Sequence, residues 1–137
     1  MSILENIAEI RKDANRHSQD FFIHFFKKFP QQQNRFSEYR GKHSDSLKSL
    51  AKFGKHPPKV LNAVLNLIER SGDQGALRGD AKKVAQMSQH SGMGMQDYTD
   101  LFSALISYLG ETLGGSCDRH GWQAAVNSVT KALSEEV

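Results

Sequence analysis

Apolar residues recur three and four positions apart along almost the whole chain, and no stretch alternates between apolar and polar residues. This periodicity predicts amphipathic helices and no strands. The first predicted helix begins after Ser2, whose hydroxyl can cap it. A second helix carries five phenylalanines within 21–29 and ends before Pro30, since proline is not tolerated in a helix interior. Pro30 can instead open a short third helix.

The helical pattern resumes at Asp45 and continues to about Arg70. Further helices are predicted over about 77–91, over an apolar stretch around 98–109, and after Asp118, a plausible cap for the last helix. The sequence therefore predicts a single all-α domain, residues 1–137, with about seven or eight helices. We expect pairwise crossing helices around a pocket rather than an up-and-down bundle.

Composition and charge narrow the class of protein. The 137 residues are 38% hydrophobic and 24% charged, which suits one domain that buries roughly two thirds of its unfolded surface. No apolar run reaches the ~18 residues that a membrane span requires, and the N-terminus lacks the basic segment of a signal peptide. Cys117 is the only cysteine, so no intrachain disulfide can form, and we expect an intracellular, cytoplasmic setting.

The net charge of +3 comes from thinly spread lysines and arginines. The only tight pairs are Lys27–Lys28 and Lys82–Lys83. Nucleic-acid binding needs a basic stripe that contacts successive phosphates. We therefore expect a solvated surface, with no nucleic-acid partner and no membrane partner, and the sequence leaves the oligomeric state open.

Two histidines, His56 and His90, lie on successive helical patterns, with Phe36 upstream. Two imidazoles presented in this way can face a flat metal cofactor such as haem from both sides. We interpret His90 as the permanent ligand to the iron and His56 as the residue on the opposite, distal face. A lone histidine is more often solvated or hydrogen-bonded than a ligand, and that interpretation is kept for His17, His24, His43 and His120.

The surroundings of His90 favour binding of a gas. Met87 lies three residues earlier, on the same helical face, and is expected to pack beneath the cofactor ring. A backbone carbonyl near Gln86 can accept the Nδ1–H of His90 and orient its ring. No Asp or Glu stands where it could replace that carbonyl, and a carbonyl polarises imidazole less than a carboxylate does. This favours ferrous, gas-binding iron over peroxidase-type iron.

Around His56 the spacing predicts an apolar pocket. Val60 follows His56 by one turn and can wall the pocket, while Lys52, one turn before, can reach a haem propionate. Phe36 is expected to press against the porphyrin.

The substrate cavity of this interpretation is apolar. Two phenylalanines of the second helix would close it, and Leu101 and Phe102 would line its back. Its predicted lining is Phe22, Phe25, Val60 and Leu101. His56 is the candidate catalytic residue in this cavity.

The chain resembles the globins over its whole length, and within them the dehaloperoxidase-type coelomic haemoglobins of terebellid marine worms. The resemblance implies a globin fold, a b-type haem, reversible O₂ binding, and H₂O₂-dependent oxidation of halophenols in the distal cavity. The segments that carry it are Ile-Ala-Glu-Ile-Arg (7–11), Arg-Phe-Ser-Glu-Tyr (35–39), Leu-Lys-Ser-Leu-Ala-Lys-Phe-Gly-Lys-His (47–56), Gln-Met-Ser-Gln-His-Ser (86–91) and the final helix from Trp122 to Leu133.

One departure from the resembling sequences changes the expected geometry. Pro57 and Pro58 directly follow His56, where the relatives carry ordinary helix formers. Prolines inside a helix are costly, so we expect one helix over 45–54 and a new helix that starts at the prolines. His56 would then be pushed out of helical dihedrals, as residues before proline are.

Three functions follow from these residues. The first is an oxygen carrier or store with secondary peroxidase activity, in which His56 donates a hydrogen bond to the ligand. The second is a haem peroxidase acting on H₂O₂ and small phenols, in which His56 moves a proton between the peroxide oxygens and Tyr39, Tyr98 or Trp122 can carry oxidising equivalents. The third is a helical interaction domain without haem.

Overall fold

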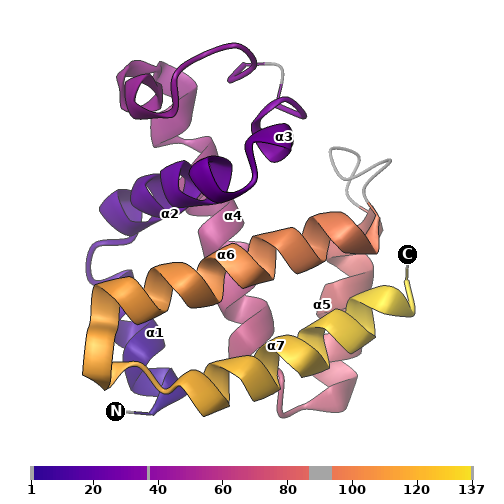
Figure 1. The fold of residues 1–137 in the computed structure, drawn as a ribbon. Coiled ribbons are helices and arrows are strands. Elements are labelled where there is room, and N and C mark those ends of the chain that lie inside the picture. The colour runs from indigo at the N-terminus through magenta and orange to yellow at the C-terminus, as the bar shows by residue number, and fades with distance from the viewer. Residues whose placement is uncertain (1, 37, 87–93, 137) are drawn as a thin grey trace.

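The computed structural model describes residues 2–36, 38–86 and 94–136 (Figure 1). Within these ranges the regular structure is helical throughout, as predicted. The elements are α1 (Ile3–Arg11), α2 (Ala14–Lys28), α3 (Pro30–Gln33), the 3₁₀ helices η1 (Ser44–Ser49) and η2 (Ala51–Gly54), α4 (His56–Glu69), α5 (Gln74–Gln86), α6 (Met95–Leu113), the 3₁₀ turn η4 (Gly114–Ser116) and α7 (Arg119–Ser134). No helix of the described part is long and apolar enough to cross a membrane.

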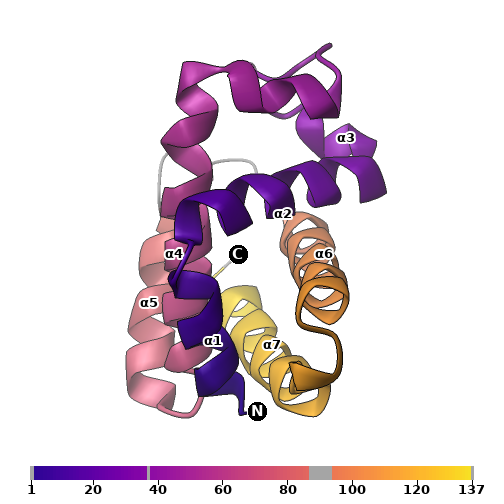
Figure 2. The same cartoon turned by 90° about the vertical axis from the view of Figure 1, so that its left-hand side faces the viewer.

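Helices α2, α6 and α7 run steeply across α1, α4 and α5, so the helices do not form a single parallel bundle (Figures 1 and 2). Helix α2 packs against both α4 and α6, and α7 packs against α4, α5 and α6. Figure 2 shows α2 lying across α4 at one end and above α6 at the other. Residues from all these helices form one hydrophobic core. The architecture matches the predicted crossing of helix pairs.

The N-terminal helix α1 is capped at its first turn. Ser2 and Glu5 form a reciprocal capping box, in which the Ser2 hydroxyl accepts from the Glu5 amide at 3.2 Å and the Glu5 carboxylate accepts from the Ser2 amide at 3.1 Å. Such a box satisfies two backbone donors that the first turn leaves unpaired. Ser2 is therefore the cap that the sequence predicts for this helix.

Asn6 links α1 to the connection between α6 and α7. Its side chain is fully buried. The Asn6 amide nitrogen donates to the carbonyl of Ser116 at 2.8 Å. The Asn6 amide oxygen accepts from the backbone of Asp118 at 2.8 Å and from the indole N–H of Trp122 at 3.1 Å. One buried amide thus satisfies three groups of the distant turn.

The segment before His56 differs from the prediction. Residues 44–54 form two short 3₁₀ helices, separated by extended backbone at Leu50, so the expected single helix over 45–54 is wrong. Serine hydroxyls explain part of this result, because Ser46 donates to the carbonyl of His43 and Ser49 donates to the carbonyl of Ser46, both at 2.7 Å. Such local bonds compete with a regular helix.

A new helix does start at the prolines, as predicted. Pro57 and Pro58 lie in the first turn of α4, where the amide N–H that proline lacks would have no partner inside the helix. The helix nevertheless begins one residue earlier, at His56. The expectation that His56 lies outside the helix is therefore wrong. His56 is instead the first residue of α4, directly before the two prolines.

A buried polar junction joins α3 to the start of α6. The Gln32 amide nitrogen donates to a carboxylate oxygen of Asp97 and to one of Asp100, each at 3.0 Å. Arg35 lies 3.3 Å from the other oxygen of Asp97. The Asp97 carboxylate also accepts from the amide of Gly94 at the start of α6. These contacts hold the short helix α3, and the chain that follows it, against α6.

We expect replacement of Asn6 by alanine to destabilise the fold substantially, because it leaves a buried indole N–H, a backbone N–H and a carbonyl without their partner. The expected loss in free energy of unfolding is about 3 kcal/mol, measured by urea unfolding. Asn127 is an exposed asparagine of α7, and Asn127→Ala is the matched control, with little change expected. Equal losses in the two variants would show that Asn6 has no special anchoring role.

Candidate functional site

The imidazole of His56 lies against aromatic side chains from two other parts of the chain. The centroid of its ring is 5.5 Å from that of Phe36 and 5.9 Å from that of Phe22. Phe22 comes from the middle of α2, and Phe36 follows α3. The structure therefore brings together three residues that the sequence predicts around one haem: His56 and Phe22 at its distal cavity and Phe36 against the porphyrin. His56 itself is half-buried. Part of the residue therefore remains accessible to solvent or to a ligand.

Tyr39 is a further member of this cluster, and its hydroxyl lies 3.4 Å from Nδ1 of His56. The Tyr39 side chain is 1% exposed. Burial raises the pKa of its phenol to about 12, so the hydroxyl keeps its proton at neutral pH. The sequence suggests only an oxidative role for Tyr39 and does not predict this contact. The signal in the sequence is that Tyr39 follows Phe36 by three residues, a spacing that can place both in one turn. In the structure the amide of Tyr39 donates to the carbonyl of Phe36 at 2.9 Å.

The remaining residues of the predicted pocket come from α2, α4 and α6. Phe25 is 3% exposed, and its ring packs against the neighbouring phenylalanine rings at positions 21, 22, 26 and 29. Val60 and Leu101 are half-buried and pack against the core from α4 and α6. Two further half-buried apolar residues, Val84 of α5 and Met95 of α6, were not singled out from the sequence. The roles of Phe25, Val60 and Leu101 in a substrate cavity stay predictions.

Three predicted cofactor contacts lie outside what the structure describes. His90, the predicted iron ligand, and Met87 fall in the segment 87–93, and the side chain of Lys52 is also outside the described part. Their roles therefore rest on the sequence. What the structure does show is the opposite side of the predicted site, which consists of the His56 imidazole and its aromatic neighbours.

The described residues suit a haem in their chemistry. A porphyrin needs apolar, flat-sided neighbours and one polar group aimed at the sixth coordination position. Phe22 and Phe36 supply aromatic surface, and His56 supplies one imidazole in contact with it. Phe36, Val60, Leu101, Val84 and Met95 are apolar residues that the fold leaves partly exposed, and they come from α4, α5, α6 and the chain after α3.

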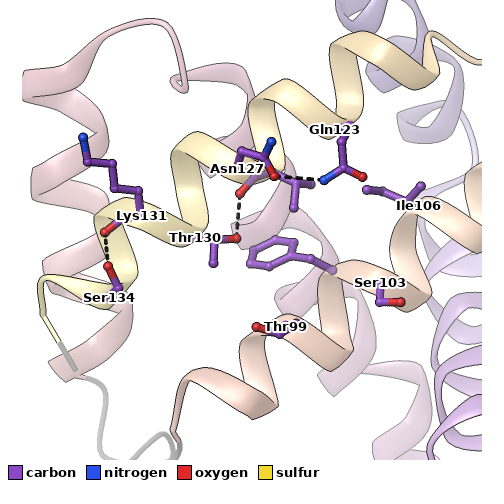
Figure 3. Close-up of a pocket in the computed structure, with 10 residues that line it drawn as sticks. Thr99, Ser103, Ile106, Gln123, Asn127, Thr130, Lys131 and Ser134 are labelled. Atoms are coloured by element: carbon purple, nitrogen blue, oxygen red, sulfur yellow. Dashed lines mark hydrogen bonds between the residues drawn. The ribbon is translucent and has the colours of Figure 1, made fainter.

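A separate groove of about 430 Å³ lies between α6 and α7 (Figure 3). Its polar groups bond mainly within α7: Thr130 donates to the carbonyl of Val126, Ser134 donates to that of Lys131, and the side chain of Gln123 donates to that of Asn127. Of the residues predicted to surround the haem, Phe102 borders this groove, whereas His56, Phe36 and Val60 do not. The groove is lined by Thr99, Phe102, Ser103, Ile106, Gln123, Val126, Asn127, Thr130, Lys131 and Ser134.

Comparison with known proteins identifies the class to which this fold and site belong. The sequence model of the Globin family matches residues 19–133, which span α2 to α7 and include both predicted haem histidines. The chain belongs to the globin family. Membership implies a haem cofactor, and globins bind O₂ as a ligand.

The similar proteins are invertebrate globins. A globin of Nerita albicilla is 26% identical over 138 residues, covering 98% of this chain and 88% of that protein. Globin CTT-V of Chironomus thummi piger is 27% identical over 134 residues, covering 93% of this chain and 82% of that protein. The finer resemblance to dehaloperoxidase-type haemoglobins stays a prediction.

Solved structures support the fold independently. The ferric myoglobin of Aplysia limacina with azide has a TM-score of 0.81 and 17% identity, covering 96% of this chain and 90% of the myoglobin. A second structure of that myoglobin, described in different liganded states, also has a TM-score of 0.81, covering 99% of this chain and 98% of the other. The globin fold predicted from the sequence is thus confirmed.

Three of the four histidines that the sequence sets apart from the haem pair have hydrogen-bond partners elsewhere, and the fourth is exposed. His17 is buried, and its Nδ1 lies 2.8 Å from the hydroxyl of Tyr108. His24 lies 3.0 Å from the hydroxyl of Ser107. The Nδ1 of His43 accepts from the amide of Asp45, and His120 is exposed. These positions agree with ordinary structural or solvated roles.

We expect His17 to make the fold sensitive to mild acid. Burial, with a smaller contribution from Arg16, lowers the pKa of His17 from its ordinary 6.5. The unfolded chain therefore takes up the proton first, so stability is complete above about pH 6.5 and is lost as the pH falls toward the lower folded pKa. Urea unfolding between pH 7.5 and 5 measures this loss.

In that experiment His17→Gln is expected to flatten the pH dependence, because glutamine does not titrate. The matched control is His120→Gln, which removes an exposed imidazole and should leave the wild-type dependence in place. An unchanged slope in the His17 variant would assign the acid sensitivity to other groups.

Proposed function

We propose that this globin is an intracellular oxygen carrier or store, with secondary H₂O₂-dependent peroxidase activity. In this proposal residues 1–137 form one domain that holds one haem b without a covalent link, because the sequence contains no Cys-x-x-Cys-His motif for attachment. The observation that carries the proposal is the His56 imidazole held against Phe22 and Phe36. Such a site combines one hydrogen-bonding group with an otherwise apolar wall.

In this proposal, different residues of the protein act on the two faces of the haem. When bound, the haem iron supplies the position at which O₂ binds reversibly. His90 is the proposed ligand that holds the iron, with Met87 beneath the ring and Lys52 near a propionate. His56 faces the opposite side and donates a hydrogen bond to the gas. The cytoplasmic setting of the proposal rests on the lone cysteine, Cys117.

Apolar side chains are proposed to keep water from the gas site. Phe36, Val60 and Leu101 are partly exposed in the fold, and contact with a porphyrin would cover apolar surface that otherwise meets water. Burial of such surface contributes about 25 cal/mol per Å². Exclusion of water slows the loss of an electron from ferrous iron.

A specific contact favours the secondary peroxidase activity. A histidine that moves a proton must be held in a fixed orientation, and the contact between His56 and Tyr39 can provide this. Small phenols would lie against Phe22, Phe25, Val60 and Leu101. The activity is ranked second because no arginine neighbours His56 in the sequence, and His90 has no nearby carboxylate in sequence to strengthen it as a ligand.

Replacement of His90 by glycine tests the iron ligand. We expect the wild-type protein to show the visible spectrum of a haem protein, with a Soret band that responds to dithionite, O₂ and CO. His90→Gly should lose haem readily, and added imidazole should restore binding because it can occupy the vacated position. His120→Gly is the matched control. An unchanged ferrous-CO spectrum and haem affinity in His90→Gly would contradict the assignment.

Replacement of His56 by valine tests both activities. We expect faster autoxidation of the O₂ complex, because the hydrogen bond to the gas is lost. Turnover of trichlorophenol with H₂O₂ should fall by about 10²–10⁴-fold, the usual contribution of a general acid–base residue. His43→Val, at an exposed position, is the control. A wild-type rate far above that of an ordinary myoglobin would make peroxidase the primary function.

A further inference from the structure

We propose that Tyr39 is a positioning residue for His56: its hydroxyl donates a hydrogen bond to Nδ1 and so holds the imidazole with its proton on Nε2. The Nε2–H then faces the haem side as a hydrogen-bond donor. This inference rests on the proposed function, in which His56 is the distal histidine, and it assigns to Tyr39 the choice between the two neutral forms of that histidine.

The position of the Tyr39 hydroxyl is set by its neighbours. Its ring packs edge-on against Phe53 at 5.4 Å between centroids and lies 5.6 Å from Phe36 and 6.0 Å from Phe26. The backbone is held as well, because the amide of Tyr39 donates to the carbonyl of Phe36 at 2.9 Å and its carbonyl accepts from the buried side chain of Gln33 at 2.8 Å. The Tyr39 hydroxyl is therefore held in place, 3.4 Å from Nδ1 of His56.

The direction of the hydrogen bond follows from how the two groups can pair. A neutral imidazole has one N–H and one lone pair, whereas a phenol has one O–H and can also accept. Among the described residues, the Tyr39 hydroxyl forms its hydrogen bond with His56 alone. If Nδ1–H donated to Tyr39, the buried O–H would have no acceptor there, which is unfavourable. Donation by Tyr39 satisfies both groups.

The protonation state of Tyr39 supports this direction. The pKa of its phenol is raised to about 12 by burial, so the hydroxyl carries the proton that it must donate at neutral pH. The bond then reserves Nδ1 of His56 as an acceptor, and the remaining proton of the neutral ring must reside on Nε2.

The consequence lies at the gas site. A gas ligand that carries partial negative charge, such as O₂ on ferrous haem, is stabilised by an N–H donor and repelled by an imidazole lone pair. Without the Tyr39 hydroxyl the two neutral forms of His56 become closer in free energy, and the ring is less restrained. Tyr39 thereby favours retention of O₂ over retention of a less polar ligand such as CO.

The test uses the haem-loaded protein in its ferrous CO complex, which is diamagnetic and suits NMR. In the wild-type protein ¹⁵N NMR of the His56 ring is expected to show an unprotonated Nδ1 and a protonated Nε2. A proton found on Nδ1 would overturn the proposal directly, without any variant. Tyr39→Phe keeps the ring and removes only the hydroxyl, and it is expected to shift the Nδ1 resonance and the C–O stretching frequency.

The O₂ dissociation rate of Tyr39→Phe should rise about threefold to tenfold, as expected for loss of one hydrogen bond. The matched control is Tyr108→Phe, which removes the hydroxyl of another buried tyrosine that contacts a histidine, His17. It should leave the gas-binding spectra and rates unchanged. Equal effects of the two variants would indicate a general loss of stability and overturn the specific role of Tyr39.

His56→Val separates this inference from the function on which it rests. If His56→Val alters O₂ dissociation and the C–O stretch while Tyr39→Phe alters neither, Tyr39 has no positioning role and His56 remains the distal residue. If His56→Val also alters neither, His56 is not the distal residue, and the role of Tyr39 fails together with it.

Discussion

Aromatic packing on one face of α2 is the interaction on which the rest of the structure depends. Phe22 and Phe26 are fully buried and contact the rings of Phe36, Tyr39 and His56. Each fully buried side chain of this size contributes about 1.5–3 kcal/mol relative to exposure. Helix α2 also packs on α6, where Phe21 contacts Tyr108, so α2 joins the helix that carries His56 to the helix that carries Leu101.

Packing of this kind has little directional preference, and buried polar groups fix the relative orientation of the packed elements. Asn6 fixes the turn between α6 and α7, and Gln32 fixes α3 against the start of α6 through Asp97 and Asp100. Hydrogen bonds inside a protein act over short, defined geometries, so a buried polar group favours a single arrangement. Gln33 has the same effect on Tyr39. Apolar packing therefore holds the aromatic cluster together, and the buried hydrogen bonds fix how its elements are oriented.

The two activities proposed for this globin make different demands on the same imidazole. Gas binding needs a steady donor, whereas acid–base chemistry needs a group that can exchange protons in a fixed orientation. The contact between Tyr39 and His56 bears on both, since it restrains the ring and occupies Nδ1. The polar groups of the groove between α6 and α7 bond mainly within α7, and neither His56 nor Tyr39 borders that groove.

The sequence by itself determined the helical class, the approximate position of the helices, the restart at Pro57–Pro58 and the grouping of Phe22, Phe36 and His56. These features follow from local periodicity, from the missing N–H of proline and from a family pattern that spans residues 19–133. Only the tertiary structure decided that residues 44–54 form 3₁₀ helices and that α4 begins at His56. It also decided that the Tyr39 hydroxyl meets Nδ1 of His56. The physical reason is that spacing along the chain fixes which face a side chain occupies. The partner of a buried hydroxyl is fixed by distant segments, here α2, η2 and α4, that pack around it.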